Sequence, residues 1–225
     1  MSEESIQNEM PSEQNPDVAQ EQIPESVLRR LPKYLAVAQV LEEMGWDFVT
    51  SADLARACEV KEMLVRKDLA WTGVVGRPRF GYPIHGLIGA VFDVVGWNHV
   101  RKAVFVGPAS VAESLTIGFS FPQHGLQLVG VVDDAAAGST AAGVRVLSFS
   151  DFIAEQGTDP INLAILCVPA ELAQSFCDRL VAHGIRGIWN FAPTTLAVPQ
   201  EVSVSDADLS SSLAILCHDL VRRGR

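Results

Sequence analysis

The chain has 225 residues, 48% of them hydrophobic, which is enough for one large domain or two of modest size with apolar cores. No stretch approaches the roughly eighteen apolar residues of a membrane-spanning helix, and the first residues lack the basic and apolar regions of a secretory signal. The formal net charge of −10 at pH 7 argues against a general attraction to nucleic acid, so any DNA-binding surface must be local.

The first 22 residues hold six acidic side chains and no Lys or Arg. This segment also contains Pro11 and Pro16 and few apolar residues, a composition typical of disordered chains. We therefore predict a disordered acidic tail over residues 1–22. Residues 23–100 carry nine basic and nine acidic side chains, so this part of the chain is neutral overall.

Three helices are predicted after the tail. Apolar residues over 27–44 recur at helical spacing, and Pro32 either kinks this helix or stands in the first turn of one that begins later. Residues 50–57 have the capped start of a short second helix, and a tight turn leads to a third helix over about 61–71. Two short helices joined by a tight turn are typical of a helix-turn-helix.

Residues 73–82 predict a small β-hairpin, since glycines bound the segment and apolar or aromatic residues flank Arg77 and Arg79. A hairpin beside a helix-turn-helix is the wing of a winged helix. Helical sequence over 85–96 then leads to a second region. We therefore expect a winged-helix DNA-binding domain over residues 23–97.

The second region alternates short apolar strands with helices. Strands are predicted at 102–106, 126–132, 144–147, 162–168 and 187–191, with helices at 110–119, from 150 onward and at 170–183. Such alternation predicts a doubly wound parallel sheet, so the fold class is α/β with a Rossmann-like domain over 98–205. A last helix at about 210–222 presents an apolar stripe of Leu213, Leu216 and Leu220, within a C-terminal segment at 206–225.

The first strand of this region leads into the turn where a Rossmann unit binds a pyrophosphate on helix N–H groups, and an acidic residue after the second strand binds the ribose. Ala112 replaces the third glycine of that turn, an accepted change, but Ala109 replaces the second and brings a methyl group to the pyrophosphate, while Pro108 lacks an N–H. A Rossmann domain that has lost its dinucleotide therefore remains an alternative. The candidate cofactor-binding residues here are Gly107, Pro108, Ala109, Ser110, Val111, Ala112 and Asp133.

Two further loops follow predicted strands and are expected at the same edge of the sheet, where doubly wound domains bind ligands. They contain Val168 with Pro169, and Asn190 with Phe191. These residues could cover a nicotinamide ring with apolar surface. They fit ordinary strand-to-helix turns equally well.

Several ordered motifs carry a family resemblance. Residues 65–69 read VRKDL, residues 184–193 read GIRGIWNFAP, and the intervening wing segment contains Gly73, Gly76, Arg77, Gly81 and Tyr82. The sequence resembles the Rex family of redox-sensing transcriptional repressors over nearly all of residues 23–222. The resemblance implies a homodimer that binds double-stranded operator DNA, is released by NADH, takes NAD(H) as cofactor and swaps its C-terminal helix between subunits.

The resemblance also assigns residues to DNA. Arg66 and Lys67 match the recognition helix, and Arg77 matches the arginine of the wing that reaches towards the minor groove. Arg79 stands on the same hairpin tip, while Pro78 stands where the family has a glycine. If Arg66 contacts bases, its replacement by alanine should cost about 1–3 kcal/mol of operator binding. The alternative is a charged face that binds protein instead.

No catalytic residue is predicted, because a dehydrogenase would need a proton-transfer His or a Lys-Tyr pair beside the cofactor. The four cysteines form no CxxC pair and stand at no metal-ligand spacing from a histidine, which favours reduced thiols in a cytoplasmic protein without a metal site. Two different functions stay open for the second region. One is a Rossmann module that binds coenzyme A, and the other is a DNA-binding dimer whose Rossmann domain answers another ligand or only dimerises.

Overall fold

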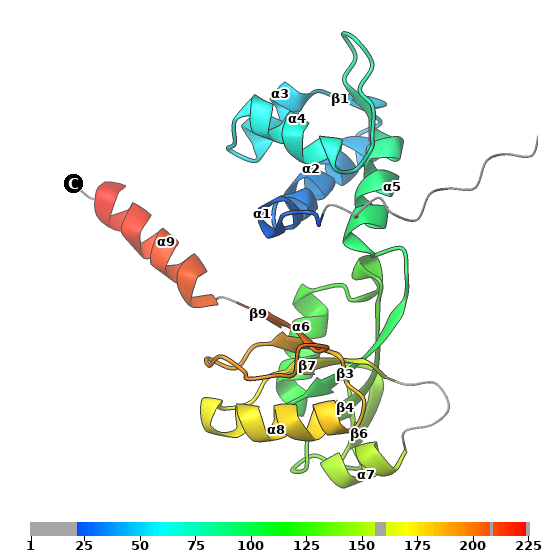
Figure 1. The fold of residues 1–225 in the computed structure, drawn as a ribbon, viewed down its shortest axis with the longest axis vertical. Coiled ribbons are helices and arrows are strands. Elements are labelled where there is room, and N and C mark those ends of the chain that lie inside the picture. Colours follow the sequence, from blue (N-terminus) through cyan, green and yellow to red (C-terminus); the bar gives the residue numbers. More distant parts are fainter. Residues whose placement is uncertain (1–21, 156–160, 208, 224–225) are drawn as a thin grey trace, which may run out of the picture. The chain divides into compact units, whose positions relative to one another are not determined.

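A computed structural model describes residues 22–155, 161–207 and 209–223 of the chain (Figure 1). The chain divides into two compact units, Met1–Val91 and Phe92–Arg225. The division falls inside the helix α5 (Ile84–Val95), whereas the sequence pattern predicted the end of the first domain at residue 97. Residues 1–21 of the predicted acidic tail lie outside the described residues, so the disorder of that tail stays a prediction.

The first unit contains the predicted helix-turn-helix. In place of one helix over 27–44 there are two, α1 (Glu25–Leu28) and α2 (Leu31–Glu43), because Pro32 stands in the first turn of α2. The helix-turn-helix proper consists of α3 (Ser51–Ala57) and α4 (Glu62–Ala70). α3 begins as predicted, since Thr50 and Asp53 form a capping box in which Thr50 Oγ1 accepts from the Asp53 N–H at 3.1 Å.

Asp68 fixes the inner face of α4 to the first helices of the unit. Its side chain is buried and accepts from Arg30 Nε and Nη2 at 2.6 and 2.8 Å, and from the Tyr34 hydroxyl at 2.8 Å. Burial, aided by this hydrogen bond, raises the pKa of Tyr34 far above its ordinary value, so the hydroxyl remains a donor. The hydrogen bonds from Arg30 to Asp68 raise the pKa of the Arg30 guanidinium. The opposite face of α4, with Arg66 and Lys67, is left exposed.

The wing differs from the predicted hairpin. The ladder that supports it pairs β1 (Phe48–Val49) with β2 (Tyr82–Pro83), so one of its strands precedes α3. Between α4 and β2 the chain forms a loop closed by an isolated bridge between Arg77 and Gly81. Gly81 is required there: its φ is +92°, and a Cβ would lie 2.3 Å from the carbonyl oxygen of Val49. The glycine-rich composition therefore produces a loop with a single bridge instead of two strands.

The second unit is built on a seven-stranded sheet in the order β5-β6-β4-β3-β7-β8-β9, in which only β5 and β6 pair antiparallel. Without β5 this is the strand order of the dinucleotide-binding Rossmann fold, so the predicted fold class is confirmed. β5 and β9 were not predicted, because one is very short and the other reads as a polar segment. The strands are β3 (Arg101–Val106), β4 (Leu126–Val132), β5 (Thr140–Ala141), β6 (Val144–Leu147), β7 (Leu163–Leu166), β8 (Gly187–Asn190) and β9 (Ser203–Asp206).

Helices cover both faces of this sheet (Figure 1). β3 shows why, because its alternate side chains enter two different cores. Val104 and Val106 pack with α7 (Phe149–Ala154) and α8 (Ala170–Ala182), while Phe105 packs with α6 (Ala109–Gly118). β7 ends earlier than the predicted strand at 162–168, which leaves Cys167 and Val168 in the loop that leads to α8.

The chain ends in α9 (Leu209–Arg223), none of whose described residues is buried. Leu209, Leu213, Leu216 and Leu220 recur at spacings of four and three along it, and each is more than half exposed. This is the predicted apolar stripe, and it has no partner among the described residues. In the described part of the chain, no helix has both the length and the apolar character needed to cross a bilayer.

Candidate functional site

The predicted nucleotide-binding residues lie at or just beyond the carboxyl ends of strands in the second unit. Gly107 follows β3 with φ +146°, and its N–H donates to the Val132 carbonyl at 3.0 Å. A Cβ on Gly107 would lie 2.1 Å from the carbonyl oxygen of Cys167, just after the neighbouring β7. Glycine is therefore the residue that lets the ends of β3 and β7 meet, at the point where the order of strands reverses.

The first turn of α6 holds the next predicted residues, and Asp133 contacts it directly. Pro108 is the N-cap of α6 and has no N–H to offer, and the N–H of Ala109 donates to Asp133 Oδ2 at 2.9 Å. The other carboxylate oxygen of Asp133 accepts from the Ala135 N–H at 3.0 Å. The carboxylate predicted to bind a ribose thus already occupies one N–H that a pyrophosphate would use. In the same turn, Ser110 and Val111 are exposed and Ala112 is buried.

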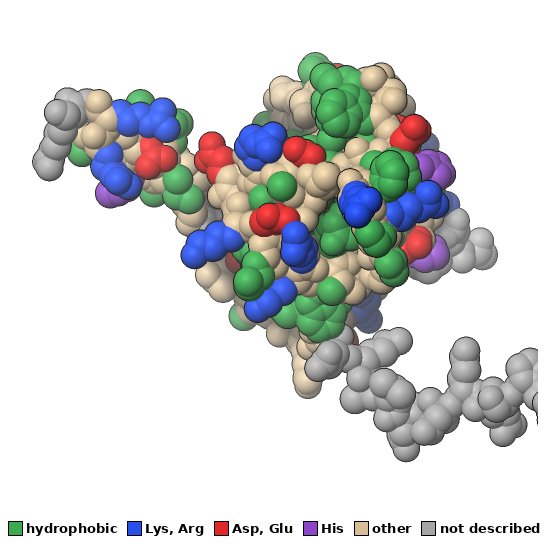
Figure 2. Space-filling model, turned by 90° about the horizontal axis from the view of Figure 1, so that it is seen from above, with side chains coloured by type: hydrophobic (Ala, Val, Ile, Leu, Met, Phe, Trp, Pro, Cys, Tyr) green, Lys and Arg blue, Asp and Glu red, His purple; other side chains and the backbone are tan. Residues whose placement is uncertain are grey.

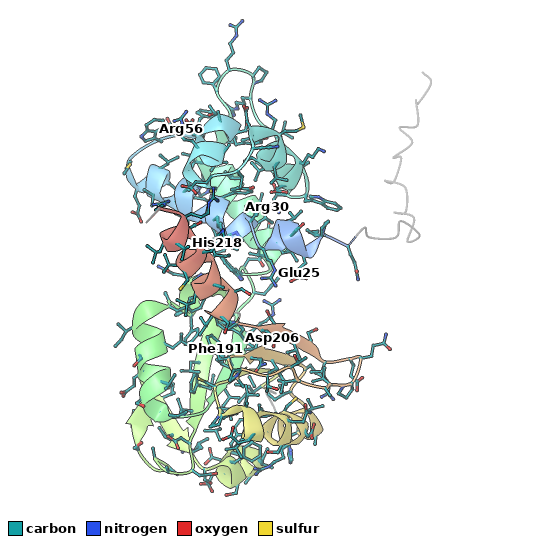
Figure 3. All side chains as sticks on the ribbon, turned by 90° about the vertical axis from the view of Figure 1, so that its left-hand side faces the viewer. Glu25, Arg30, Arg56, Phe191, Asp206 and His218 are labelled. Carbon is teal, nitrogen blue, oxygen red and sulfur yellow. The ribbon has the colours of Figure 1, made fainter. Side chains whose placement is uncertain are left out.

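The other two predicted loops lie further along the same edge. Val168 is half-buried, and Pro169 is the exposed N-cap of α8. Asn190 is buried and fully engaged: its Nδ2 donates to the Thr194 carbonyl and to Asp206 Oδ1, both at 2.8 Å, and its Oδ1 accepts from the Ala192 N–H. The hydrogen bond from Asn190 to Asp206 joins the end of β8 to the end of β9. Figure 3 labels Asp206 and Phe191, the residue after β8, and the Phe191 ring packs 4.9 Å from that of Trp189.

A cavity of about 410 Å³ lies elsewhere in the second unit. It is apolar for the most part and gathers residues from the start of β4, which is the amino end of that strand. It is therefore separate from the predicted nucleotide site. Its lining residues are Val100, Thr116, Phe121, Pro122, Leu126, Gln127, Leu128 and Ala142.

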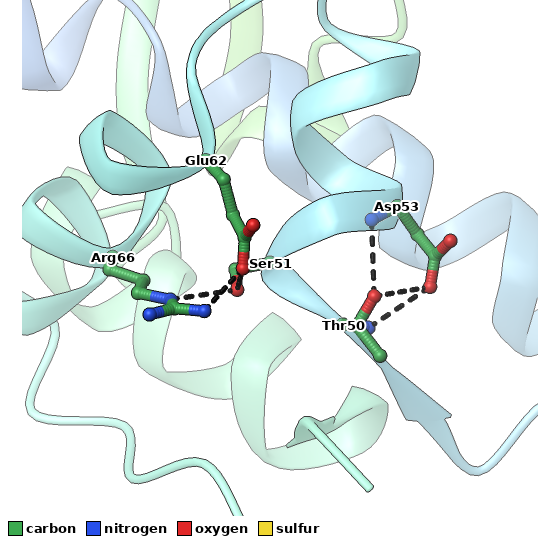
Figure 4. Close-up of polar contacts among 5 residues, drawn as sticks. All are labelled: Thr50, Ser51, Asp53, Glu62 and Arg66. Atoms are coloured by element: carbon green, nitrogen blue, oxygen red, sulfur yellow. Dashed lines mark hydrogen bonds and ion pairs between the residues drawn. The ribbon is translucent and has the colours of Figure 1, made fainter. Parts of the chain in front are cut away.

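The predicted recognition helix carries Arg66 in a fixed position. Arg66 Nε donates to Ser51 Oγ at 3.1 Å, its Nη2 bonds to Glu62 Oε1, and Ser51 Oγ donates to the same carboxylate oxygen at 2.8 Å (Figure 4). The hydrogen bond from Ser51 and then that from Arg66 hold the pKa of Glu62 below its ordinary value, so Glu62 is ionised at neutral pH. Lys67 is exposed in the last turn of α4.

The wing carries Arg77 and Arg79 on its exposed loop. The Arg77 guanidinium lies 5.3 Å from the centre of the Phe48 ring, which packs in turn against Phe80. Within the loop, Arg79 has a positive φ of +69°, a conformation that residues with a Cβ adopt rarely. On the face seen in Figure 2, Lys and Arg side chains are interspersed with exposed apolar and acidic ones.

Sequence patterns missed the residues that hold these basic side chains in place. The contacts of the buried Asp68 with Arg30 and Tyr34, and that of Ser51 with Arg66, join different helices, and no spacing rule gives them. One signal was available: an acidic residue four positions before an arginine, as in Glu62 and Arg66, predicts an ion pair on a helix face.

Comparison with known proteins gives independent information on both units. A family model described as a putative DNA-binding protein N-terminus matches residues 22–70, and one described as a CoA binding domain matches residues 106–194. The sequence is 30% identical over 200 residues to the redox-sensing transcriptional repressor Rex of Bacteroides fragilis, covering 88% of this chain and 91% of that protein. It is 34% identical to the Rex of Treponema denticola, covering 84% and 91%. The chain belongs to the Rex family.

A solved Rex structure resembles the fold over 90% of the chain. RSP, a Rex-family repressor whose structure was solved in complex with β-NAD⁺ and operator DNA, superposes with a TM-score of 0.80. The sequences are 27% identical, and the match covers 90% of this chain and 94% of RSP. The same repressor in complex with β-NADH gives a TM-score of 0.77 at 25% identity. Both units of this chain therefore have counterparts in one Rex protein.

Proposed function

We propose that this chain is a redox-sensing transcriptional repressor that binds operator DNA as a homodimer and is released by NADH. One observation carries the proposal: a single chain combines a winged helix with exposed arginines and a Rossmann sheet whose first turn needs Gly107. Its relatives are named as repressors of this kind. The protein is accordingly a regulator rather than an enzyme. We place it in the cytoplasm, because a bacterial-type repressor meets its operator DNA there.

On the DNA side, we propose that Arg66 and Lys67 of α4 enter the major groove and that Arg77 and Arg79 of the wing contact the adjacent minor groove. All four side chains are exposed and lie on the two elements that meet DNA in winged helices. The buried Asp68 supports this arrangement, because it holds α4 with the opposite face outward. Local charge matters more than the net charge of the chain for such contacts.

On the nucleotide side, we propose that NAD(H) binds at the carboxyl edge of the second unit. The residues fit the group: Gly107 lets the turn after β3 pass the Cys167 carbonyl where the order of strands reverses, and the Asp133 carboxylate stands after β4, where its free lone pairs can accept from ribose hydroxyls. Phe191 and Val168 offer apolar surface along the same edge. The cofactor serves here as a ligand whose binding reports the NADH/NAD⁺ ratio, with no bond made or broken.

For the homodimer, we propose that α9 packs against a second copy of the chain. Its leucines at spacings of four and three form the kind of stripe that helices bury against each other, and they are exposed in the single chain. A dimer also places two α4 helices for a pseudo-palindromic operator.

The test is a titration of a DNA complex. The full-length protein selects duplexes from a random-sequence pool, and fluorescence anisotropy then follows the selected duplex at fixed salt while NADH or NAD⁺ is added. We expect NADH to weaken binding by about tenfold or more, as a typical allosteric coupling does, and NAD⁺ to leave it in place. Release by neither nucleotide, at concentrations up to millimolar, contradicts the redox part of the proposal.

A specific contact favours a second candidate function, a Rex-like DNA-binding dimer whose second unit no longer binds the dinucleotide. The N–H of Ala109 is engaged by Asp133, and Pro108 has none to give, so the α6 N-terminus has fewer donors left for a pyrophosphate. In that case the second unit binds another ligand or serves only to form the dimer.

Replacing Ala109 by glycine separates the two candidates. If the dinucleotide binds here, removing the methyl group should tighten NADH binding several-fold, because the backbone can approach the pyrophosphate more closely. Calorimetry on the purified protein measures the change. The matched control is Ala135→Gly, since the Ala135 N–H donates to the other oxygen of Asp133, and it should leave the affinity unchanged. No NADH binding in either variant supports the second candidate.

A further inference from the structure

Arg66 differs from the other candidate DNA-binding residues in having its guanidinium held, within the described residues, by side-chain hydrogen bonds. Two contacts from different elements hold it: Ser51 lies at the start of α3, and Glu62 lies in the first turn of α4. Because Ser51 also donates to Glu62, the three side chains form a closed triangle (Figure 4). We call this triangle the Arg66 clamp.

The clamp leaves Arg66 available to a ligand. Its side chain remains 64% exposed, and its contacts use one N–H on Nε and one on Nη2. Both N–H groups on Nη1 make no hydrogen bond within the described residues. An arginine fork needs two parallel donors to bind the guanine edge, and the rotamers of a free arginine side chain carry about 2 kcal/mol of entropy that binding removes. A guanidinium already fixed loses less of this freedom.

Glu62 also adds a negative charge to the surface that would face DNA. A carboxylate there repels phosphates, so it lowers affinity for any duplex, whatever its sequence. By contrast, Lys67, Arg77 and Arg79 form no ion pair within the described residues, and they suit phosphate contacts, which position a protein without reading sequence. A gain in selectivity at Arg66 would offset this loss of affinity.

We propose that Ser51 and Glu62 are positioning residues that set Arg66 for a base contact and that Glu62 at the same time suppresses sequence-independent binding. This rests on the proposed DNA-binding function and extends it to the source of operator specificity. Through Arg66 the two residues affect the contact with the operator, whereas the charge on Glu62 lowers affinity for any duplex.

Two substitutions at one position isolate this effect. Glu62→Ala and Glu62→Gln remove the same charge, but only glutamine keeps an oxygen that accepts from Ser51 and Arg66. Dissociation constants for the selected duplex and for a scrambled duplex of equal length are measured on the full-length dimer over a range of salt concentrations. Thermal melts confirm that each variant is folded.

Both variants should bind the scrambled duplex more tightly than the unmodified protein, and equally so. On the selected duplex, Glu62→Ala should bind about fivefold more weakly than Glu62→Gln. Alanine removes the oxygen that accepts from Arg66, and the loss of one hydrogen bond corresponds to a change of this size. In an Arg66→Ala background the difference between the two should vanish, because the residue that they position is gone. Glu25→Gln is the control, because it alters an exposed ion pair of the same i,i+4 spacing, between Glu25 of α1 and Arg29. It should change neither dissociation constant.

Equal binding of Glu62→Ala and Glu62→Gln to the selected duplex overturns the clamp, and so does a difference that survives in the Arg66→Ala background. These results leave the repressor function intact. If the unmodified protein selects no preferred duplex at all, the proposed function fails instead, and the two failures are thereby distinguished.

Discussion

Replacing Asp68 by alanine should unfold the helix-turn-helix more readily than any other change on α4. Asp68 is buried and accepts three hydrogen bonds, two from Arg30 and one from Tyr34. Its removal leaves a guanidinium, itself only 23% exposed in its side chain, without its partner, and a buried hydroxyl without its acceptor. Loss of one member of such a pair costs about 3–5 kcal/mol, a large part of the stability of a small domain.

Hydrogen exchange of the full-length protein, followed by mass spectrometry, measures this effect by segment. Peptides from α1, α2 and α4 should lose protection in Asp68→Ala, while peptides from β3 and β7 in the second unit keep theirs. Tyr34→Phe removes one of the three hydrogen bonds and should cost about 1 kcal/mol. The exposed pair of Glu25 and Arg29 gives the control, because Glu25→Gln should cost less than about 0.5 kcal/mol. Unchanged protection of α4 in Asp68→Ala would mean that packing alone holds this helix.

Local sequence signals predicted the elements well wherever hydrogen bonding or periodicity within one segment decides the structure. The capping box at Thr50 and Asp53 and the apolar strand β4 were predicted at or near their observed bounds. β9 was missed, since its residues are polar and its place in the sheet depends on pairing with β8, to which Asn190 and Asp206 bind it. A wing of two strands was predicted, but the ladder uses β1, a partner that precedes α3 in the chain.

For the candidate site too, the sequence predicted the positions of residues but not their side-chain contacts. Sequence placed Gly107 and Asp133 at the carboxyl edge of the sheet because strand order and chain length determine such positions. The sequence could not predict that Asp133 accepts from the Ala109 N–H. Nor could it predict that the side-chain amide of Asn190 makes its hydrogen bonds to other residues of the protein. These contacts depend on side-chain rotamers across neighbouring strands. The roles of these residues towards a nucleotide stay predictions.

Gly107→Ala should disrupt the second unit more strongly than any other single alanine at its carboxyl edge. Two independent costs add at this position. The backbone has φ +146°, a region that residues with a Cβ rarely adopt, and the new Cβ would lie 2.1 Å from the Cys167 carbonyl oxygen. That oxygen belongs to the backbone just after β7, so it cannot rotate away as a side chain would. Relief requires the ends of β3 and β7 to separate, and we expect a loss of about 4 kcal/mol or more.

Gly184→Ala separates the two costs. Gly184 follows α8 in the same unit with φ +98°, but nothing lies within 4 Å of its Cβ position, so alanine there carries only the backbone strain of about 1–2 kcal/mol. Urea unfolding followed through hydrogen exchange of β3 and β7 peptides compares the two variants, with α4 peptides as the internal reference. If Gly107→Ala cost no more than Gly184→Ala, the strands would be free to part at little expense. The close meeting of β3 and β7 would then not be what requires glycine at the proposed nucleotide site.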